Sequence, residues 1–150
     1  MGWGHLLFEF SGRTNRGKFW FASLVLIVIY LAFVALDFVT ESMAVQALTA
    51  MFIIVIFISG LAVGVKRLHD RDKSGWYIVL FYVLPCALFV ASMTISSGSA
   101  TTANALGLLA FAISVWAFVE LGCLRGTIGV NPYGPDPVAP ATLPPVRTPV

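Results

Sequence analysis

The sequence predicts an all-α integral membrane protein: a four-transmembrane-helix bundle with a short N-terminal interfacial helix and a disordered, proline-rich C-terminal tail. Three observations support this fold class. Of the 150 residues, 59% are hydrophobic and 11% are charged, whereas an ordinary soluble domain carries roughly 25% charged residues. Four apolar runs are long enough to cross a hydrocarbon core of about 30 Å as helices. The Lys and Arg residues all lie outside these runs.

The four spans are predicted at residues 19–38, 45–65, 76–95 and 104–124, within a transmembrane domain from 19 to 124. The first run contains a single charge, Asp37, the fourth contains Glu120, and the other two contain none. Every backbone polar group in lipid must be satisfied within its own segment, so each run is expected to be helical. The flanking segments, 1–18 and 125–150, are too short for a catalytic domain of typical size.

The positions of the nine Lys and Arg residues predict the orientation. Three precede the first span, four lie between the second and third spans, and two follow the fourth. Short loops that carry Lys and Arg remain in the cytoplasm. We therefore expect both termini and the middle loop to be cytoplasmic.

The two flanking segments are predicted to behave differently. In the cytoplasmic segment 1–18, Trp3, Leu6, Leu7 and Phe10 recur at a spacing that gives a short helix one apolar face. This pattern favours an anchor at the membrane surface, with a lid over the cytoplasmic helix ends as the alternative. From Asn131 onward the cytoplasmic tail holds seven of the eight prolines. Such a segment is expected to be extended and mobile.

Two features inside the spans concern helix packing. Pro85 lies in the third span, where it removes a backbone hydrogen bond and is expected to kink the helix. Gly60 and Gly64 are four residues apart in the second span and allow two backbones to approach closely. Packing within one chain is the simpler interpretation, and a homo-oligomer or a membrane-protein partner stays open.

Three stretches outside the spans carry a recognisable pattern. They are residues 10–20, residues 66–76, which include Arg67-Leu68-His69-Asp70 and Ser74-Gly75-Trp76, and residues 126–137, which end in Asn131-Pro132-Tyr133-Gly134-Pro135-Asp136-Pro137. Together they resemble the bacterial inner-membrane family catalogued as domain of unknown function 805, over about residues 8 to 137. Pro132 and Gly17-Lys18 depart from the usual pattern. The resemblance implies a small multi-pass protein of the bacterial cytoplasmic membrane, and it supplies no established activity.

The predicted topology brings these stretches to one side of the membrane. The candidate cluster there, for a ligand, a partner or structure alone, comprises Arg13, Arg16, Arg67, His69, Asp70, Glu120, Asn131 and Tyr133. Glu120 lies within the last span, where an unpaired carboxylate costs several kcal/mol. We expect Arg67 or Arg13 to pair with it. Lys66 and Asp70 are four residues apart and are predicted to pair on an extension of the second helix.

These residues support two hypotheses from different classes. The first is a non-enzymatic membrane module whose basic cytoplasmic face binds anionic lipid headgroups or a protein partner. The second is a small oligomeric transporter or channel subunit that uses Glu120 and the Pro85-kinked helix. A third interpretation is that the basic residues set the topology and do nothing more. No catalytic constellation, metal site, cofactor or nucleic-acid partner is expected from these motifs.

Overall fold

The computed structural model describes residues 2–40, 42–95 and 98–139 of the chain. Its elements are α1 (Trp3–Phe8), α2 (Arg16–Thr40), α3 (Met43–Asp70), the π-helical turn η1 (Val79–Val83), α4 (Leu84–Ile95), α5 (Ala100–Ala117) and the π-helical turn η2 (Phe118–Cys123). Within the described ranges, backbone pairing of the β type is confined to an isolated bridge between Asn131 and Gly134. The all-helical fold class is therefore confirmed for these residues.

Three helical segments are long and apolar enough to cross a membrane, namely Arg16–Thr40, Met43–Asp70 and Ala100–Cys123. The apolar helix Val79–Ile95, which corresponds to the predicted span 76–95, is shorter. Turn hydrogen bonds extend it backwards, because the amides of Tyr77 and Ile78 donate to the carbonyls of Ser74 and Gly75 at 3.2 and 3.0 Å. Its helical path therefore starts close to the predicted boundary.

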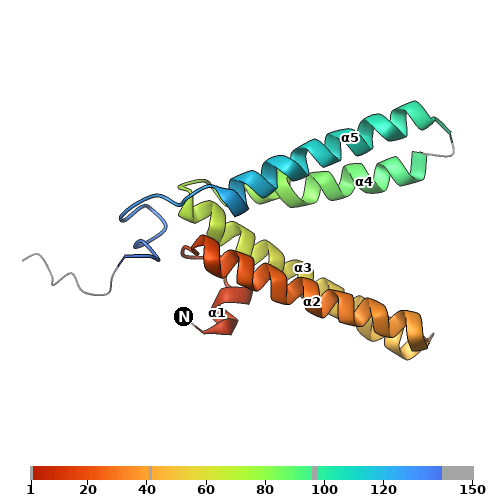
Figure 1. Ribbon diagram of the computed structural model, residues 1–150, viewed down its shortest axis with the longest axis horizontal. Coiled ribbons are helices and arrows are strands. Elements are labelled where there is room, and N and C mark those ends of the chain that lie inside the picture. The colour runs from red at the N-terminus through yellow and green to blue at the C-terminus, as the bar shows by residue number, and fades with distance from the viewer. Residues whose placement is uncertain (1, 41, 96–97, 140–150) are drawn as a thin grey trace, which may run out of the picture.

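The helices form two antiparallel hairpins that diverge from a shared end (Figure 1). One hairpin is α2 with α3, and the other is α4 with α5. The hairpins meet through η2, which contacts α2 and α3 of the first hairpin, while η1 packs on α4 and α5. This arrangement differs from the single four-helix bundle predicted from the sequence. The physical reason is that lipid is as apolar as the helix surfaces, so no hydrophobic force closes the two hairpins along their length.

Most of the buried apolar side chains gather at the shared end. The cluster comprises Leu6, Phe19, Ala22, Val63, Leu68, Phe81, Ala117 and Leu121. Further along the hairpins large hydrophobic side chains are exposed, as a lipid environment allows; for example, Phe38 is 86% exposed and Met43 is 87% exposed. Helix α1 joins the cluster through Leu6 and packs against α3. The shared end is therefore the packed part of the molecule.

Pro85 continues α4, and the irregular backbone lies immediately before it in η1. In a regular α-helix the ring of Pro85 would clash with the carbonyl of Phe81, four residues earlier. The chain instead makes a π-helical turn there, in which the amide of Leu84 donates to the carbonyl of Val79. Such a turn is one of the recognised ways in which a helix absorbs an irregularity.

The two glycines of the small-residue motif have different surroundings. A Cβ atom on Gly64 would lie 2.6 Å from Cδ1 of Ile78 and 3.3 Å from Cε2 of Tyr82. A Cβ atom on Gly60 would meet nothing within 4 Å in the described residues. Gly64 therefore serves the contact between α3 and the start of the second hairpin, which is packing within one chain.

This difference gives a matched pair of substitutions. Gly64→Leu should destabilise the protein by about 1–3 kcal/mol because it overpacks the contact with Ile78 and Tyr82. Gly60→Leu should leave the stability unchanged or slightly raised, because the side chain enters open space and replaces a poor helix former. Thermal unfolding of both variants in the same detergent tests this. Equal melting temperatures for the two variants would contradict it.

Candidate functional site

The centre of the shared end is the buried carboxylate of Asp70, at the last residue of α3. Arg13 donates from Nε and Nη2 to Oδ1 of Asp70, at 3.1 and 3.0 Å. Arg67, one turn earlier on α3, donates from Nη1 to Oδ2. All three residues are buried, with Arg67 completely inaccessible. A buried carboxylate between two arginines satisfies charges that would be costly to bury alone.

The segment after η2 wraps around this pair. The amide and the hydroxyl of Thr127 both donate to the backbone carbonyl of Asp70, at 2.8 and 3.1 Å. Arg13 donates its remaining hydrogens to the carbonyls of Thr127, Gly129 and Gly134, at 2.6, 2.7 and 3.2 Å. The start of the predicted disordered tail is therefore folded against Asp70. The prediction of an extended tail is wrong for this part, because its carbonyl groups complete the coordination of a buried arginine.

The backbone after η2 passes so close to the Asp70 carboxylate that a glycine is required at position 126. A Cβ atom there would lie 2.0 Å from Oδ2 of Asp70. The backbone therefore passes directly over the carboxylate, which a side chain at this position would prevent. The later prolines from Pro140 onward lie outside the described residues.

Arg67 also joins the two hairpins. Its Nε donates to the carbonyl of Leu121 at 2.7 Å, and its Nη2 donates to the carbonyl of Leu124. These carbonyls belong to the last turn of η2 and to Leu124, which follows it, where a helix has no further backbone donors of its own. A cation at this position also interacts favourably with the helix dipole.

Two residues of α2 complete the cap on η2. Arg16 donates from Nη1 to the carbonyl of Cys123 at 3.0 Å. Trp20 donates from Nε1 to the carbonyl of Gly122 at 3.0 Å, and its ring lies so close that a Cβ atom on Gly122 would be 2.5 Å from it. The end of the second hairpin is therefore held by side chains of the first.

Glu120 is buried and paired, but its partners differ from the predicted ones. Nη2 of Arg71 lies 3.1 Å and Nζ of Lys73 lies 2.8 Å from its Oε1. The prediction of Arg67 or Arg13 as the partner is wrong, because both of those side chains are committed to Asp70 and to backbone carbonyls. The ion pairs join η2 to the segment after α3.

Lys66 does not pair with Asp70, which corrects the predicted pair. Its ammonium group donates to the carbonyl of His5 and, at 2.9 Å, to the carbonyl of Leu6. Lys66 is completely buried, and its own carbonyl accepts from the amide of Thr14 at 3.2 Å. Lys66 therefore attaches α1 to α3 by capping its carbonyl groups.

His69, Asn131 and Tyr133 form the outer part of the cluster. The His69 ring stacks on the Tyr133 ring, with 3.9 Å between centroids and 5° between planes. Its Nδ1 lies 3.2 Å from the carbonyl of Gly12, which favours the tautomer that is protonated there. Asn131 donates from Nδ2 to the carbonyl of His69 and to the hydroxyl of Thr127, at 2.8 and 3.0 Å. The adjacent His69 and Asp70 thus have separate structural contacts.

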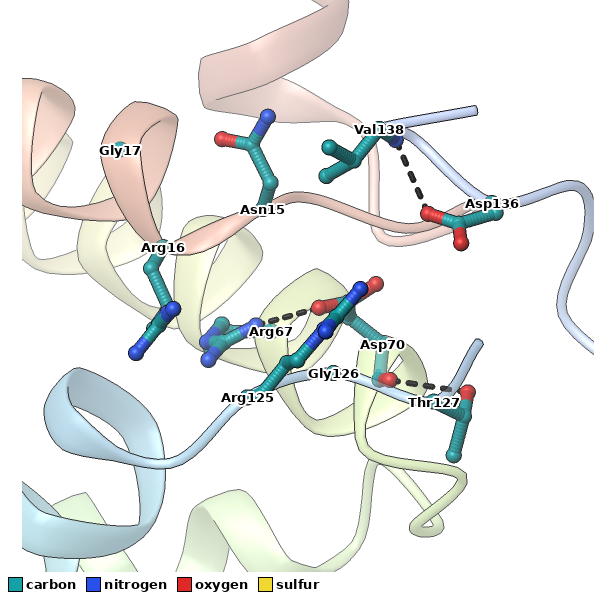
Figure 2. A pocket seen from close by; sticks show the side chains of 10 residues that line it. All are labelled: Asn15, Arg16, Gly17, Arg67, Asp70, Arg125, Gly126, Thr127, Asp136 and Val138. Atoms are coloured by element: carbon teal, nitrogen blue, oxygen red, sulfur yellow. Dashed lines mark hydrogen bonds and ion pairs between the residues drawn. The ribbon is translucent and has the colours of Figure 1, made fainter. Parts of the chain in front are cut away.

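A pocket of about 350 Å³ opens beside Asp70. It is lined by Asn15, Arg16, Gly17, Arg67, Asp70, Arg125, Gly126, Thr127, Asp136 and Val138. Figure 2 shows that its arginines come from three places: the start of α2, the end of α3 and the segment after η2. Hereafter we refer to it as the arginine pocket.

The carboxylate of Asp136 lies at the rim of the arginine pocket. Its oxygens accept hydrogen bonds from the amides of Val138 and Gly129, at 2.9 and 3.2 Å. These bonds are the main reason why the pKa of Asp136 is lowered, with a smaller contribution from Arg13 and Arg125. Asp136 is therefore ionised at neutral pH and offsets part of the positive charge.

The structure brings all eight predicted cluster residues to the shared end. They comprise Arg13, Arg16, Arg67, His69, Asp70, Glu120, Asn131 and Tyr133. The sequence reasoning missed the roles of Trp20, Lys66, Arg71, Lys73, Gly122, Arg125, Gly126 and Thr127. Most of them lie within the three motif stretches: Trp20 in the first, Lys66, Arg71 and Lys73 in the second, and Gly126 and Thr127 in the third. Gly122 and Arg125 lie outside these stretches and carry no distinctive spacing.

The fold is that of a small all-helical protein with helices suited to a membrane and a buried polar cluster at one end. A family model described as "Protein of unknown function (DUF805)" matches residues 7–135, so the chain belongs to this family. This confirms the resemblance seen in the three motif stretches.

Among the relatives of known name, Inner membrane protein YhaH of Escherichia coli (strain K12) is 28% identical over 131 residues, which cover 85% of this chain and 86% of YhaH. Inner membrane protein YhaI of the same strain is 27% identical over 128 residues, 85% of each chain. Uncharacterized protein YiiR is 31% identical over 137 residues, 87% of this chain and 86% of YiiR. No solved structure matches the chain significantly.

The central role of Asp70 can be tested against its neighbour Asp72. Asp70→Asn should destabilise the protein by about 3 kcal/mol, or about 10 °C in melting temperature, because it leaves buried arginines with an uncompensated charge. Asp72→Asn makes the same chemical change at an exposed position with a φ of 58° that asparagine accepts readily. We expect it to leave the melting temperature unchanged. Equal losses in the two variants would rule out the special role of Asp70.

Proposed function

We propose that the protein is a non-enzymatic module of the bacterial inner membrane whose arginine pocket binds the phosphate of anionic lipid headgroups. The observation that carries this proposal is the surplus of positive charge in the pocket. The charge of Asp70 is already opposed by Arg13 and Arg67. Among the described residues, Arg16 and Arg125 have no acidic partner within ion-pairing distance, and Asp136 is the carboxylate that lines the pocket besides Asp70.

The chemistry of the pocket suits a phosphate. Guanidinium groups present planar pairs of donors that match phosphate oxygens, and such hydrogen bonds are strong because both partners are charged. The first residues of α2, Arg16 and Gly17, line the same pocket and add the partial positive charge of a helix N-terminus. A phosphodiester headgroup therefore fits better than a neutral one.

The position of the pocket supports a lipid as the source of that phosphate. Trp3 begins α1, Trp20 lies in the first turns of α2 and Trp76 lies between α3 and η1; they are 53%, 42% and 81% exposed. Tryptophan collects at the level of the headgroups in membrane proteins. The arginines would then lie where anionic lipids attract each Lys or Arg by about 1 kcal/mol. A soluble protein partner is the competing occupant and is distinguished by the experiment below.

The orientation forms part of the proposal. Every Lys and Arg in the described residues lies in the segment before α2, at the start of α2, at the end of α3 or in the segments that follow α3 and η2. The positive-inside rule then favours a cytoplasmic location for the shared end and for both termini. The names of YhaH and YhaI support the inner membrane as the compartment.

The transporter alternative has less support. It depends on Glu120 as a mobile polar group in a pathway, and Glu120 is held by both Arg71 and Lys73. An ion pair that joins two segments is a structural role. The irregular turn before Pro85 is likewise accounted for by the proline ring.

If the pocket binds headgroups, the loss of bound anionic lipid should depend on which charge is removed and where it lies. Arg16→Gln and Arg125→Gln should each weaken the association of phosphatidylglycerol by about fivefold, since each removes about 1 kcal/mol of attraction. Lys18→Gln removes an equal charge nearby but outside the arginine pocket, and it should have a smaller effect. Phosphatidylglycerol and phosphatidylcholine retained by the purified protein are quantified by native mass spectrometry.

The outcomes of that measurement are decisive. Equal retention of the two lipids by the unmodified protein would overturn the proposal. So would an effect of Lys18→Gln as large as that of the arginine substitutions. Retention of a protein in place of lipid, lost in the two arginine variants, would assign the pocket to a protein partner instead.

The proposed orientation predicts a labelling pattern in intact cells. In a Cys86→Ser/Cys123→Ser background, a cysteine at Gly98, in the exposed turn before α5, should react with a membrane-impermeant maleimide. A cysteine at Asp72, in the exposed turn after α3, should react only after the membrane is permeabilised. The reverse pattern would place the arginine pocket on the opposite side.

A further inference from the structure

A second cavity, of about 220 Å³, lies between the hairpins near their shared end. Side chains from both hairpins line it, among them Phe19, Ser23, Phe81, Ser114 and Ala117. The lining is mainly aromatic and aliphatic, with a few hydroxyl groups. Hereafter we refer to it as the fork cavity. Its lining residues come from α2, η1, α5 and η2, which places it between the two hairpins.

The fork cavity and the arginine pocket follow one another along the same face of α2. Arg16 lines the pocket, Ser23 lines the cavity, and Trp20 lies between them and also lines the cavity. These three positions share a helix face because they are spaced four and three residues apart. At a rise of about 1.5 Å per residue, Arg16 and Ser23 are about 10 Å apart along the axis.

This separation matches the anatomy of a phospholipid in a bilayer. The headgroup region on each side of the hydrocarbon core is about 5–7 Å thick. A phosphate bound beside Arg16 therefore has its first acyl carbons close to the level of Ser23. A water-soluble ligand would not bind in the fork cavity, because the side chains that line it, such as Phe19, Phe81 and Ala117, are largely apolar.

We infer that one anionic phospholipid occupies both sites, with its phosphate in the arginine pocket and an acyl chain in the fork cavity. This inference rests on the proposed function and names its ligand as an intact diacyl lipid rather than a free phosphate. The acyl chain fills the space that a closed four-helix bundle would have filled with side chains. Trp20, which donates to the carbonyl of Gly122, forms the wall at which the polar and apolar parts meet.

The acyl chain also gives the lipid a structural consequence. The hairpins contact each other around η2 and diverge beyond it. A chain between α2 and α5 supplies van der Waals contacts to both hairpins at the point where direct packing ends. The bound lipid therefore joins the two hairpins in addition to anchoring the basic end.

The test fills the fork cavity without changing any charge. Ser114→Phe places a bulky side chain in the cavity, and Ala112→Phe places the same side chain elsewhere on α5, at an exposed position that does not line it. Both variants are purified with palmitoyl-oleoyl phosphatidylglycerol, and bound lipid per chain is measured by native mass spectrometry. We expect Ser114→Phe to retain about tenfold less lipid and Ala112→Phe to retain as much as the unmodified protein.

The arginine variants distinguish headgroup binding in the arginine pocket from acyl-chain binding in the fork cavity. If Ser114→Phe retains normal lipid while Arg16→Gln and Arg125→Gln lose it, headgroup binding stands and the fork cavity is not the acyl site. If the arginine variants retain normal lipid, the proposed function fails and this inference fails with it. A dimer that Ser114→Phe dissociates would assign the cavity to a second copy of the chain.

A folding control keeps the result interpretable. Ser114 donates a hydrogen bond only to the carbonyl of Ala110 on its own helix, among the described residues, so the substitution removes no contact between hairpins. Ser23→Phe fills the same cavity from the opposite wall. Loss of lipid in both fork variants, with melting temperatures in detergent equal to that of Ala112→Phe, supports the inference. Normal lipid in Ser23→Phe together with loss in an unfolded Ser114→Phe would overturn it.

Discussion

The buried carboxylate of Asp70 is the constraint on which the rest of the structure depends. Arg13 and Arg67 are removed from water together, and the desolvation cost is offset only when their donors and the carboxylate oxygens are all satisfied. One carboxylate cannot satisfy two guanidinium groups. The remaining donors therefore recruit backbone carbonyls from the segment after η2 and from the end of η2 itself. The loops fold around this pair because unsatisfied polar groups would be costly there.

The same constraint explains why the hairpins join at one end and diverge elsewhere. Along the apolar faces, lipid competes on equal terms with a neighbouring helix, and close packing needs small residues. Gly64 supplies such a position near the shared end, while Gly60 leads into open space. The hydrogen bonds from Arg67, Arg16 and Trp20 to the last carbonyls of η2 then fix the second hairpin. Polar satisfaction therefore fixes the arrangement together with the apolar cluster at the shared end.

A structural role and a binding role are compatible at this end because the arginines differ in how many of their hydrogen-bond donors are used within the protein. Arg13 and Arg67 use their donors within the protein. Arg16 makes a single hydrogen bond to a carbonyl, and Arg125 contributes its charge to the arginine pocket without an acidic partner among the described residues. The buried pair ties together the segments that line the pocket, and the outer pair leaves it positively charged. A preorganised site of this kind loses little entropy when an anion binds.

The sequence by itself determined the helical class, the approximate positions of the apolar helices and the gathering of the motif residues at one end. Hydrophobic length and the distribution of Lys and Arg are local properties, and they are readable without coordinates. The buried state of Glu120 was predictable too, because a carboxylate in an apolar run must find a partner.

The tertiary structure decided which groups pair, and it decided that the proline-rich segment folds back at its start. Arg71 and Lys73, rather than Arg67, reach Glu120, and the tail covers Asp70 only because Gly126 lets the backbone approach. With several arginines on one side of the membrane, many ion pairs are possible, and the sequence does not show which of them is lowest in energy. The choice among these ion pairs depends on where the backbone carbonyls lie in three dimensions. No local residue pattern encodes those positions.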